Sequence, residues 1–269
     1  MPELPEVEIV RRNLARWTVG RTVRALDAPD PRALAGDASD LVGQRFTAWE
    51  RRGKLLVGHV AGPGPAAGVL SHLGMTGKWV RASHGRRFVR LALTLDDGVV
   101  VGLVDPRRLG WTRLVAADPS AAPELHALGP DPLHDGLDGA RLAERLGGGR
   151  APLKARLMDQ ARVAGLGNIC ALEACFRAGL HPHASVASLA PADWDRLAVA
   201  TLAHIADTLA AEDGDEVAYV NEGGANGFRV YGRAAEPCPS CATPIARAAL
   251  AGRPSFFCPR CQPLPGVTP

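Results

Sequence analysis

Hydrophobic residues near the start of the chain recur every three or four positions: Val7, Val10, Leu14 and Trp17. This spacing places them on one face of a helix. We therefore predict an amphipathic helix from about Pro5 to Trp17, with the proline in its first turn, where a missing N–H is tolerated.

The pattern changes to short apolar or alternating runs between about Arg21 and Ala117. Such runs are typical of β-strands, and we predict strands at 55–60, 68–80, 88–95 and 99–104. Asp96-Asp97-Gly98 lies between the last two runs and has the composition of a hairpin turn. The first half of the chain is thus expected to be a β-sandwich or barrel with one leading helix.

Proline and glycine are frequent from Pro119 to Gly139, and helical spacing follows. We place a domain boundary in this stretch, with helices predicted at about 138–146, 151–161, 168–179 and 191–211. A chain of 269 residues is long enough for about two domains, each with its own core. A glycine-rich stretch at 222–227 then leads into a cysteine-containing end.

Two Cys-x-x-Cys pairs lie in this last segment, sixteen residues apart: Cys238, Cys241, Cys258 and Cys261. The spacing is typical of a zinc ribbon, in which four thiolates close a tetrahedral site and leave no position for substrate. We therefore predict one structural Zn²⁺. Two disulfides are the alternative, but the acidic N-terminus does not resemble a secretory signal, which favours a cytoplasmic protein with reduced thiols. Cys170 and Cys175 lack such a motif and are expected to be buried thiols in a helix.

The sequence starts Met-Pro-Glu, and removal of Met1 would leave Pro2 with a free amine. An α-amino group titrates about two to three pKa units below lysine, so more of it is unprotonated at neutral pH. Such an amine can act as a nucleophile in Schiff-base chemistry, and the adjacent Glu3 and Glu6 could transfer protons. The alternative is an ordinary helix start, in which acidic residues favour the first turn.

The net charge of +3 is only mildly basic, and its distribution is more informative than its sum. Basic residues cluster at predicted turns and element ends, where their side chains can reach phosphates. Gly165-x-Gly167 precedes a predicted helix that starts at Asn168, an arrangement that suits an anion at the helix N-terminus. These features permit nucleic-acid binding, and no segment is expected to span a membrane.

Several motifs together carry a family resemblance: PELPEVE at the start, RRGKLL with Lys54, HLGMTG from His72, DPRRLG from Asp105, LMDQ and VAGLGNI before Ile169, VYGR at 230–233 and the four cysteines. In this order they resemble the formamidopyrimidine-DNA glycosylase family over nearly the whole chain. The resemblance implies an α+β multidomain fold. It consists of an N-terminal β-sandwich with a leading helix at 1–128, a helix-two-turn-helix module at 129–228 and a zinc ribbon at 229–269.

The resemblance also implies the chemistry of a bifunctional base-excision repair enzyme that acts as glycosylase and AP lyase. Pro2 would attack C1′ of the damaged nucleoside and form an iminium, and Glu3 would handle a proton. Lys54 matches the residue that transfers protons during elimination of the 3′ phosphate. Arg253 matches the residue associated with elimination at the 5′ side, so oxidised purines would be removed by β,δ-elimination.

The expected partner is damaged double-stranded DNA, bound by a monomer. The family's backbone contacts map onto His72, Arg86, Arg150, Lys154, Asn168 and Tyr231. A flipped base leaves a space in the duplex; Met75 matches the side chain that fills it, and Arg107 the residue that contacts the opposite base.

The sequence departs from the family pattern at three places. Leu109 stands where a phenylalanine wedge is usual, and Cys170 and Leu172 replace a tyrosine and an acidic residue. The segment 212–228 is shorter than the one that contributes a loop over flipped 8-oxoguanine in many members. An endonuclease VIII-like enzyme for oxidised pyrimidines and a non-catalytic damage-binding protein are the alternatives. The PELPEVE start and Arg107 argue against the first, and Pro2, Glu3 and Lys54 argue against the second.

Overall fold

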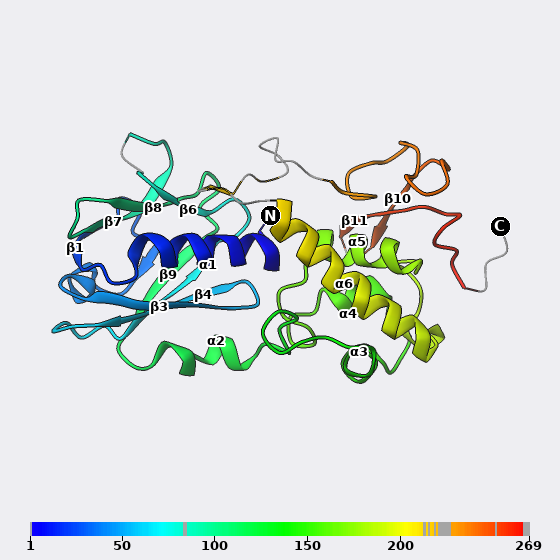
Figure 1. The fold of residues 1–269 in the computed structure, drawn as a ribbon, viewed down its shortest axis with the longest axis horizontal. Coiled ribbons are helices and arrows are strands. Elements are labelled where there is room, and N and C mark those ends of the chain that lie inside the picture. The colour runs from blue at the N-terminus through cyan, green and yellow to red at the C-terminus, as the bar shows by residue number, and fades with distance from the viewer. Residues whose placement is uncertain are drawn as a thin grey trace. The chain divides into compact units, whose positions relative to one another are not determined.

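The computed structural model describes residues 2–82, 85–211, 214, 216, 217, 219, 227–250 and 252–265. The chain divides into two compact units. The N-terminal unit comprises residues 1–127 and 209–225, and the C-terminal unit comprises 128–208 and 226–269 (Figure 1). The finer division at 128 and 228 stays a prediction.

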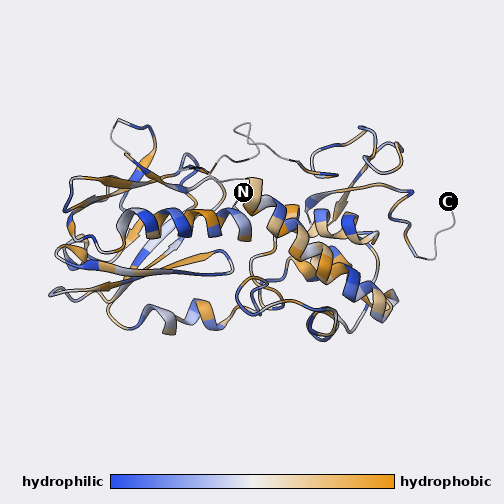
Figure 2. Ribbon diagram, viewed as in Figure 1, coloured by the Kyte–Doolittle hydropathy of each residue, from blue (hydrophilic) through white to orange (hydrophobic). Residues whose placement is uncertain are grey.

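The leading helix α1 spans Leu4–Thr18, one residue longer at each end than predicted. A capping box starts it: the Glu3 side chain accepts from the N–H of Glu6, and the Glu6 carboxylate accepts from the N–H of Glu3 at 2.8 Å. The four periodic apolar side chains are all buried in the unit's core. Hydrophobic and hydrophilic positions accordingly alternate along α1 (Figure 2).

Two sheets form the N-terminal unit. The strands are β1 Val23–Asp27, β2 Leu34–Ala35, β3 Arg45–Arg52, β4 Leu55–Ala61, β5 Gly68–His72, β6 Lys78–Arg81, β7 Val89–Leu95, β8 Val100–Val104 and β9 Trp111–Val115. One sheet has the order β1-β7-β8-β6 and the other β2-β9-β5-β4-β3. Neighbouring strands are antiparallel except for the short β2–β9 pair. A short helix, α2, follows at Pro123–His126.

The two sheets and α1 share one hydrophobic core. Phe46 and Trp49 on β3 stack with ring centroids 5.2 Å apart, and Trp79 on β6 is buried and donates its indole N–H to Ser71 Oγ at 3.1 Å. This hydrogen bond joins β6 and β5, which belong to different sheets, so the predicted sandwich is confirmed.

The expected strand at 68–80 is wrong in its middle. It is two strands, β5 and β6, separated by a turn at 73–77. Gly74 has φ +63° there, and the Gly77 N–H donates to the Leu73 carbonyl at 2.9 Å. Apolar residues on both sides of the turn conceal this break in the hydrophobic pattern. The hairpin turn at Asp96-Asp97-Gly98 is confirmed, with Gly98 at φ +81°.

The C-terminal unit contains α3 Gly139–Leu146, α4 Leu153–Leu157, α5 Asn168–Ala178 and, extending to the unit boundary, α6 Pro191–Ala211. The helix expected at 151–161 is wrong at its end, because α4 stops at Leu157. Gln160 explains the stop: its carboxamide donates to the carbonyls of Met158 and Leu166 and accepts from the N–H of Gly165. Cys170 and Cys175 are buried thiols in α5, as predicted.

The last two strands, β10 Ala246–Leu250 and β11 Arg253–Phe257, form an antiparallel hairpin. Gln262 connects it with α5, because its carboxamide accepts from the N–H of Cys258 at 2.9 Å and donates to the carbonyl of Leu180 at 2.7 Å. Among the described residues, no helix is both long enough and apolar enough to cross a membrane.

Candidate functional site

Pro2 lies immediately before the N-terminus of α1 and is buried, as is Glu3, which is 1% exposed. The first N–H groups of a helix point toward its N-terminus and carry the positive end of the helix dipole. An amine beside them is favoured in its neutral form, which is the nucleophilic one. The carboxylates of Glu3 and Glu6 both contribute to the capping box, so they fix the backbone next to Pro2.

Lys54 lies in the two-residue turn between β3 and β4, where Gly53 has φ +58°. Leu55 pairs with His72 across β4 and β5, which brings His72 near Lys54. Burial, and then the charge of Lys54, lower the pKa of His72 below its ordinary value of 6.5. The imidazole is therefore neutral near pH 7. Because its Nδ1 accepts from the N–H of Gly74 at 3.1 Å, its Nε2 carries the proton and is a donor.

Met75 and Leu109 are among the few large apolar side chains that are exposed, at 39% and 47%. Each occupies a turn, and the two turns are in direct contact. A Cβ added at Gly74 would lie 2.5 Å from the Leu109 carbonyl carbon, which shows that only glycine permits this approach. Arg107, in the second turn, is exposed as well.

A buried carboxylate organises the second turn. Asp105 is 1% exposed, and its Oδ2 accepts from the N–H groups of Leu109 and Gly110, both at 2.7 Å. Its Oδ1 accepts from the Thr76 hydroxyl at 2.5 Å and from the N–H of Arg107 at 3.1 Å. One side chain thus fixes the backbone around Arg107 and Leu109 and joins it to the Met75 turn.

The same turn is attached at one more point. Arg108 adopts a left-handed backbone, with φ +56°, and forms a two-point ion pair with Asp30 through its Nε at 2.5 Å and Nη2 at 2.7 Å. The hydrogen bonds from Arg108 lower the pKa of Asp30 to about 2. Arg108 is itself exposed, at 43%, but its ion pair with the buried Asp30 anchors the turn between Arg107 and Leu109.

Arg86 is exposed and forms an ion pair with Glu216 at 2.8 Å, and Lys78 contacts the same carboxylate at 2.7 Å. Most of segment 212–228 lies outside the described residues. Within its described part, Val217 and Tyr219 are buried in the sandwich core, and the Tyr219 hydroxyl donates to the Gly77 carbonyl at 2.6 Å. This part of the segment is thus packed on the unit that carries Met75.

In the C-terminal unit, Lys154, Asn168 and the hairpin residue Arg253 are brought together. The Lys154 ammonium is buried and donates to Ser255 Oγ at 2.9 Å and to the Pro254 carbonyl at 3.0 Å. Asn168 Nδ2 donates to the same carbonyl at 3.1 Å. Burial, and then the charge of Arg253, lower the pKa of Lys154 to about 8. Both predicted phosphate ligands therefore hold the backbone next to Arg253.

Tyr231 is half-buried, and the backbone around it is held by a carboxylate. Glu173, on α5, is fully buried and accepts from the N–H groups of Arg229, Val230 and Tyr231 at 2.9–3.0 Å. Arg150 is exposed, before α4.

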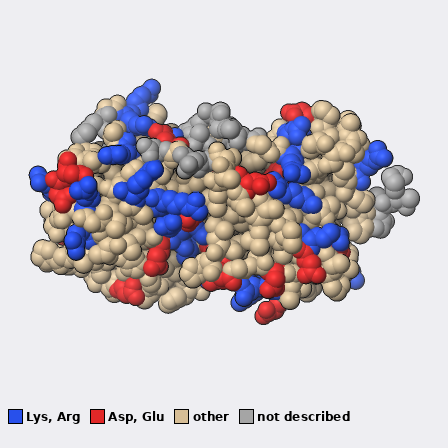
Figure 3. Space-filling view, viewed as in Figure 1, with Lys and Arg blue, Asp and Glu red and all other residues tan. Residues whose placement is uncertain are grey.

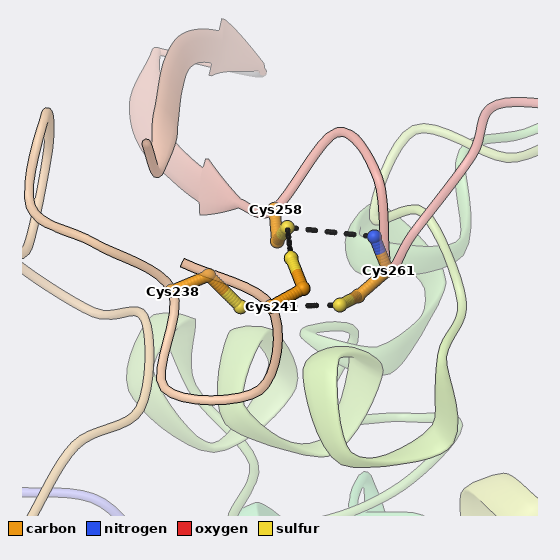
Figure 4. Close-up of side chains that lie close together, drawn as sticks. All are labelled: Cys238, Cys241, Cys258 and Cys261. Atoms are coloured by element: carbon orange, nitrogen blue, oxygen red, sulfur yellow. Dashed lines mark hydrogen bonds between the residues drawn. The ribbon is translucent and has the colours of Figure 1, made fainter. Parts of the chain in front are cut away.

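The four ribbon cysteines converge from two turns (Figure 4). Their sulfur atoms all lie within 4.8 Å of one another; the Cys238–Cys261 pair is separated by 3.9 Å and the Cys241–Cys258 pair by 3.4 Å. A tetrahedral zinc with bonds of about 2.3 Å places its sulfurs about 3.8 Å apart, whereas a disulfide bond is about 2.05 Å. The cluster fits zinc, and the metal is structural because all four positions are taken.

Sequence reasoning missed two buried carboxylates, Asp105 and Glu173, and the amide of Gln160. Asp105 is the first residue of the DPRRLG motif, but the motif alone does not indicate which groups it binds. Glu173 offered a clear signal, since an acidic residue inside the apolar run of α5 must find donors when it is buried.

Comparisons with known proteins agree with the class that these features define, a zinc-ribbon DNA glycosylase with a sandwich domain. Family models match in sequence order: the formamidopyrimidine-DNA glycosylase N-terminal domain at residues 1–112, the H2TH domain of the same enzyme at 128–217, and a zinc finger found in FPG and IleRS at 235–264. The chain belongs to the formamidopyrimidine-DNA glycosylase family.

Individual relatives cover nearly the whole chain. The formamidopyrimidine-DNA glycosylase of Acidiphilium cryptum is 40% identical over 280 residues, which cover 97% of this chain and all of the relative. That of Symbiobacterium thermophilum is 39% identical and covers 98% of this chain and 90% of the relative.

The crystal structure of MutM (Fpg) from Thermus thermophilus has a TM-score of 0.84 at 34% identity, covering 98% of this chain and 99% of that one. Lactococcus lactis Fpg in complex with N7-benzyl-Fapy-dG DNA has a TM-score of 0.86 at 28% identity, covering 97% and 100%. Further structures of the Lactococcus enzyme contain abasic-site DNA or an oxidised pyrimidine.

Proposed function

We propose that this protein is a bifunctional DNA glycosylase and AP lyase that removes oxidised purines from double-stranded DNA through a Schiff base on Pro2. The observation that carries the proposal is the position of Pro2 and Glu3 at the positive end of α1. In the same unit, Lys54 and the neutral donor His72 lie together at the ends of paired strands.

The proposed reaction starts with attack of the Pro2 nitrogen on C1′. The bond to the base breaks, the base leaves with a proton, and opening of the sugar ring gives an iminium, with Glu3 handling the proton at the ring oxygen. The iminium acidifies the C2′ hydrogen, and Lys54 takes part in its transfer while the C3′–O bond to the 3′ phosphate breaks. A second elimination breaks the bond to the 5′ phosphate, with Arg253 beside it. Water then hydrolyses the iminium, which frees Pro2, releases the sugar remnant as an unsaturated aldehyde and leaves a gap with phosphates at both ends.

The residues outside the reaction centre have proposed roles in DNA binding. A neutral His72 can donate to a phosphate, and Arg86, Arg150, Lys154, Asn168 and Tyr231 would contact or support the strand backbone. Met75 and Leu109 are exposed apolar side chains on turns, which suits insertion beside a flipped nucleotide. Arg107 would contact the opposite base. The structures of the Lactococcus enzyme in complex with damaged DNA support this partner.

Trapping with borohydride tests the proposal, because borohydride reduces an iminium to a stable covalent adduct. We expect the protein with free Pro2 to be trapped on a duplex containing formamidopyrimidine or 8-oxoguanine opposite cytosine, whereas retained Met1 or an N-terminal tag should abolish the adduct. Undiminished trapping with a blocked terminus would instead indicate a lysine nucleophile. A preference for oxidised pyrimidines on the same panel would support the endonuclease VIII-like alternative.

A further inference from the structure

A buried guanidinium connects the helix that starts after Pro2 with the turn that carries Lys54. The Arg51 side chain, at the end of β3, is only 3% exposed. Its Nε lies 3.3 Å from Glu8 Oε2 on α1, and its Nη1 donates to the carbonyl of Gly53 at 2.9 Å. Gly53 is the residue directly before Lys54, so one side chain contacts both elements.

Glu8 is the common partner of three arginines. Arg11 and Arg12 approach it from the same helix, each at 2.9 Å, whereas Arg51 comes from the sheet. Burial opposes ionisation of Glu8, but the hydrogen bonds and charges of these arginines outweigh it and lower the pKa below 4.5. The carboxylate is thus charged at neutral pH. Basic side chains gather over α1 on the face shown in Figure 3.

The location of this contact matters for the reaction. Glu8 follows Glu3 by five residues, which corresponds to about 7.5 Å along the helix axis. The Gly53 backbone is left-handed, so its carbonyl direction is set by the turn and fixed by the guanidinium. Arg51 therefore holds the Lys54 turn in register with α1.

We propose that Arg51 is a positioning residue that acts on the elimination step. The inference rests on the proposed function. Formation of the iminium uses Pro2 and Glu3 and does not need Lys54, but elimination needs a proton-transfer group close to C2′ while C1′ is bonded to Pro2. The elimination step therefore depends on the distance between α1, which follows Pro2, and the turn that carries Lys54. A small misplacement of a reacting group can cost about 100-fold in rate.

The experiment measures trapping and strand cleavage separately, on a duplex with a preformed abasic site. Arg51→Met removes the most buried of the three arginines around Glu8, so it is combined with Glu8→Gln, which keeps the net charge of the cluster unchanged. Arg51→Lys keeps the charge but cannot bridge both acceptors as a guanidinium does. Arg12→Gln is the matched control, because Arg12 contacts Glu8 from the exposed side and does not reach the turn.

We expect the double variant to form the borohydride adduct at a rate within about threefold of wild type and to cleave the strand about 10- to 100-fold more slowly. Arg51→Lys should lie in between, and Arg12→Gln should match wild type. Partial unfolding would lower the rates of trapping and cleavage together. The proposal is overturned if the ratio of these two rates in the double variant equals that of wild type, whether both rates fall or neither does. If the wild-type protein itself forms no adduct, the proposed function fails and this inference fails with it.

Discussion

The four hydrogen bonds to Asp105 predict a large effect from a one-atom change. In Asp105→Asn, the remaining oxygen can still accept from the N–H groups of Leu109 and Gly110. The new amide group then faces Thr76, which can rotate to accept, and the N–H of Arg107, which cannot accept but also donates to Thr76 Oγ1 at 3.3 Å. The substitution therefore makes the hydrogen bonds with Leu109, Gly110 and Thr76 neutral. In place of the fourth, the new amide N–H and the N–H of Arg107 face each other as two donors.

The magnitude follows from these contacts. A hydrogen bond to a charged group contributes about 1 kcal/mol more than a neutral one, so the three altered bonds account for about 3 kcal/mol. Loss of the bond from Arg107, an exposed residue whose N–H keeps Thr76 as an acceptor, adds up to about 2 kcal/mol. We expect Asp105→Asn to lower the free energy of unfolding of the N-terminal unit by about 3–5 kcal/mol. Asp118→Asn is the matched control, since Asp118 accepts one backbone hydrogen bond, from Ser120, at an exposed position.

Urea unfolding followed by tryptophan fluorescence measures this difference. The protein has five tryptophans, and Trp194 alone lies in the C-terminal unit, so a Trp194→Phe background restricts the signal to the N-terminal unit. Under the proposed function, excision of 8-oxoguanine should also fall more than cleavage of an abasic site, because only the first needs the Arg107 turn for base recognition. Surface substitutions usually change the free energy of unfolding by about 0.5 kcal/mol or less. If Asp105→Asn lowers this free energy by an amount within about 0.5 kcal/mol of the effect of Asp118→Asn, the reasoning is refuted.

Three further predictions follow from the site. Leu109→Phe should raise single-turnover excision of 8-oxoguanine more than cleavage of an abasic site in the same duplex, and equal changes on both would show that the smaller wedge is neutral. Cys241→Ala or Cys258→Ala should release the zinc, measured by metal analysis, and weaken DNA binding in a gel-shift assay while the N-terminal unit stays folded; a zinc-free wild-type protein with full activity would contradict this. Burial, and then the charge of His183, lower the pKa of His181 to about 4. The unfolded protein therefore takes up a proton on His181 at a higher pH than the folded protein, and the folded state loses stability as the pH falls from about 6.5 toward 4. At saturating zinc, the urea midpoint of wild type should therefore fall more steeply over this range than that of His181→Gln, and parallel curves would exclude His181 as the cause.

Local patterns predicted most of the fold. The helix at the N-terminus, the hairpin at Gly98 and the zinc ribbon each depend on residues close together in the sequence, which spacing alone can identify. The break between β5 and β6 did not appear in the hydrophobic pattern, because apolar residues lie on both sides of the turn. The contact of this turn with Leu109 and Gly110, more than thirty residues away, depends on the tertiary fold.

The contacts within the site that the sequence did not predict have the same origin. The resemblance assigned Lys154 and Asn168 to the DNA backbone, which stays a prediction. Their hydrogen bonds to the Arg253 hairpin, about a hundred residues away for Lys154, depend on the tertiary fold. Likewise, the donors to Glu173 come from residues 229–231. Periodicity can show that such a carboxylate is buried, but it cannot show which backbone groups it binds.

The close approach of Gly74 to Leu109 has a kinetic consequence. Two turns that touch through backbone atoms cannot move past each other, and the shared carboxylate of Asp105 adds a second connection. Under the proposed function, the backbones of the Met75 and Leu109 turns would then approach the duplex together. Only rotation of the two exposed side chains would remain independent during base flipping.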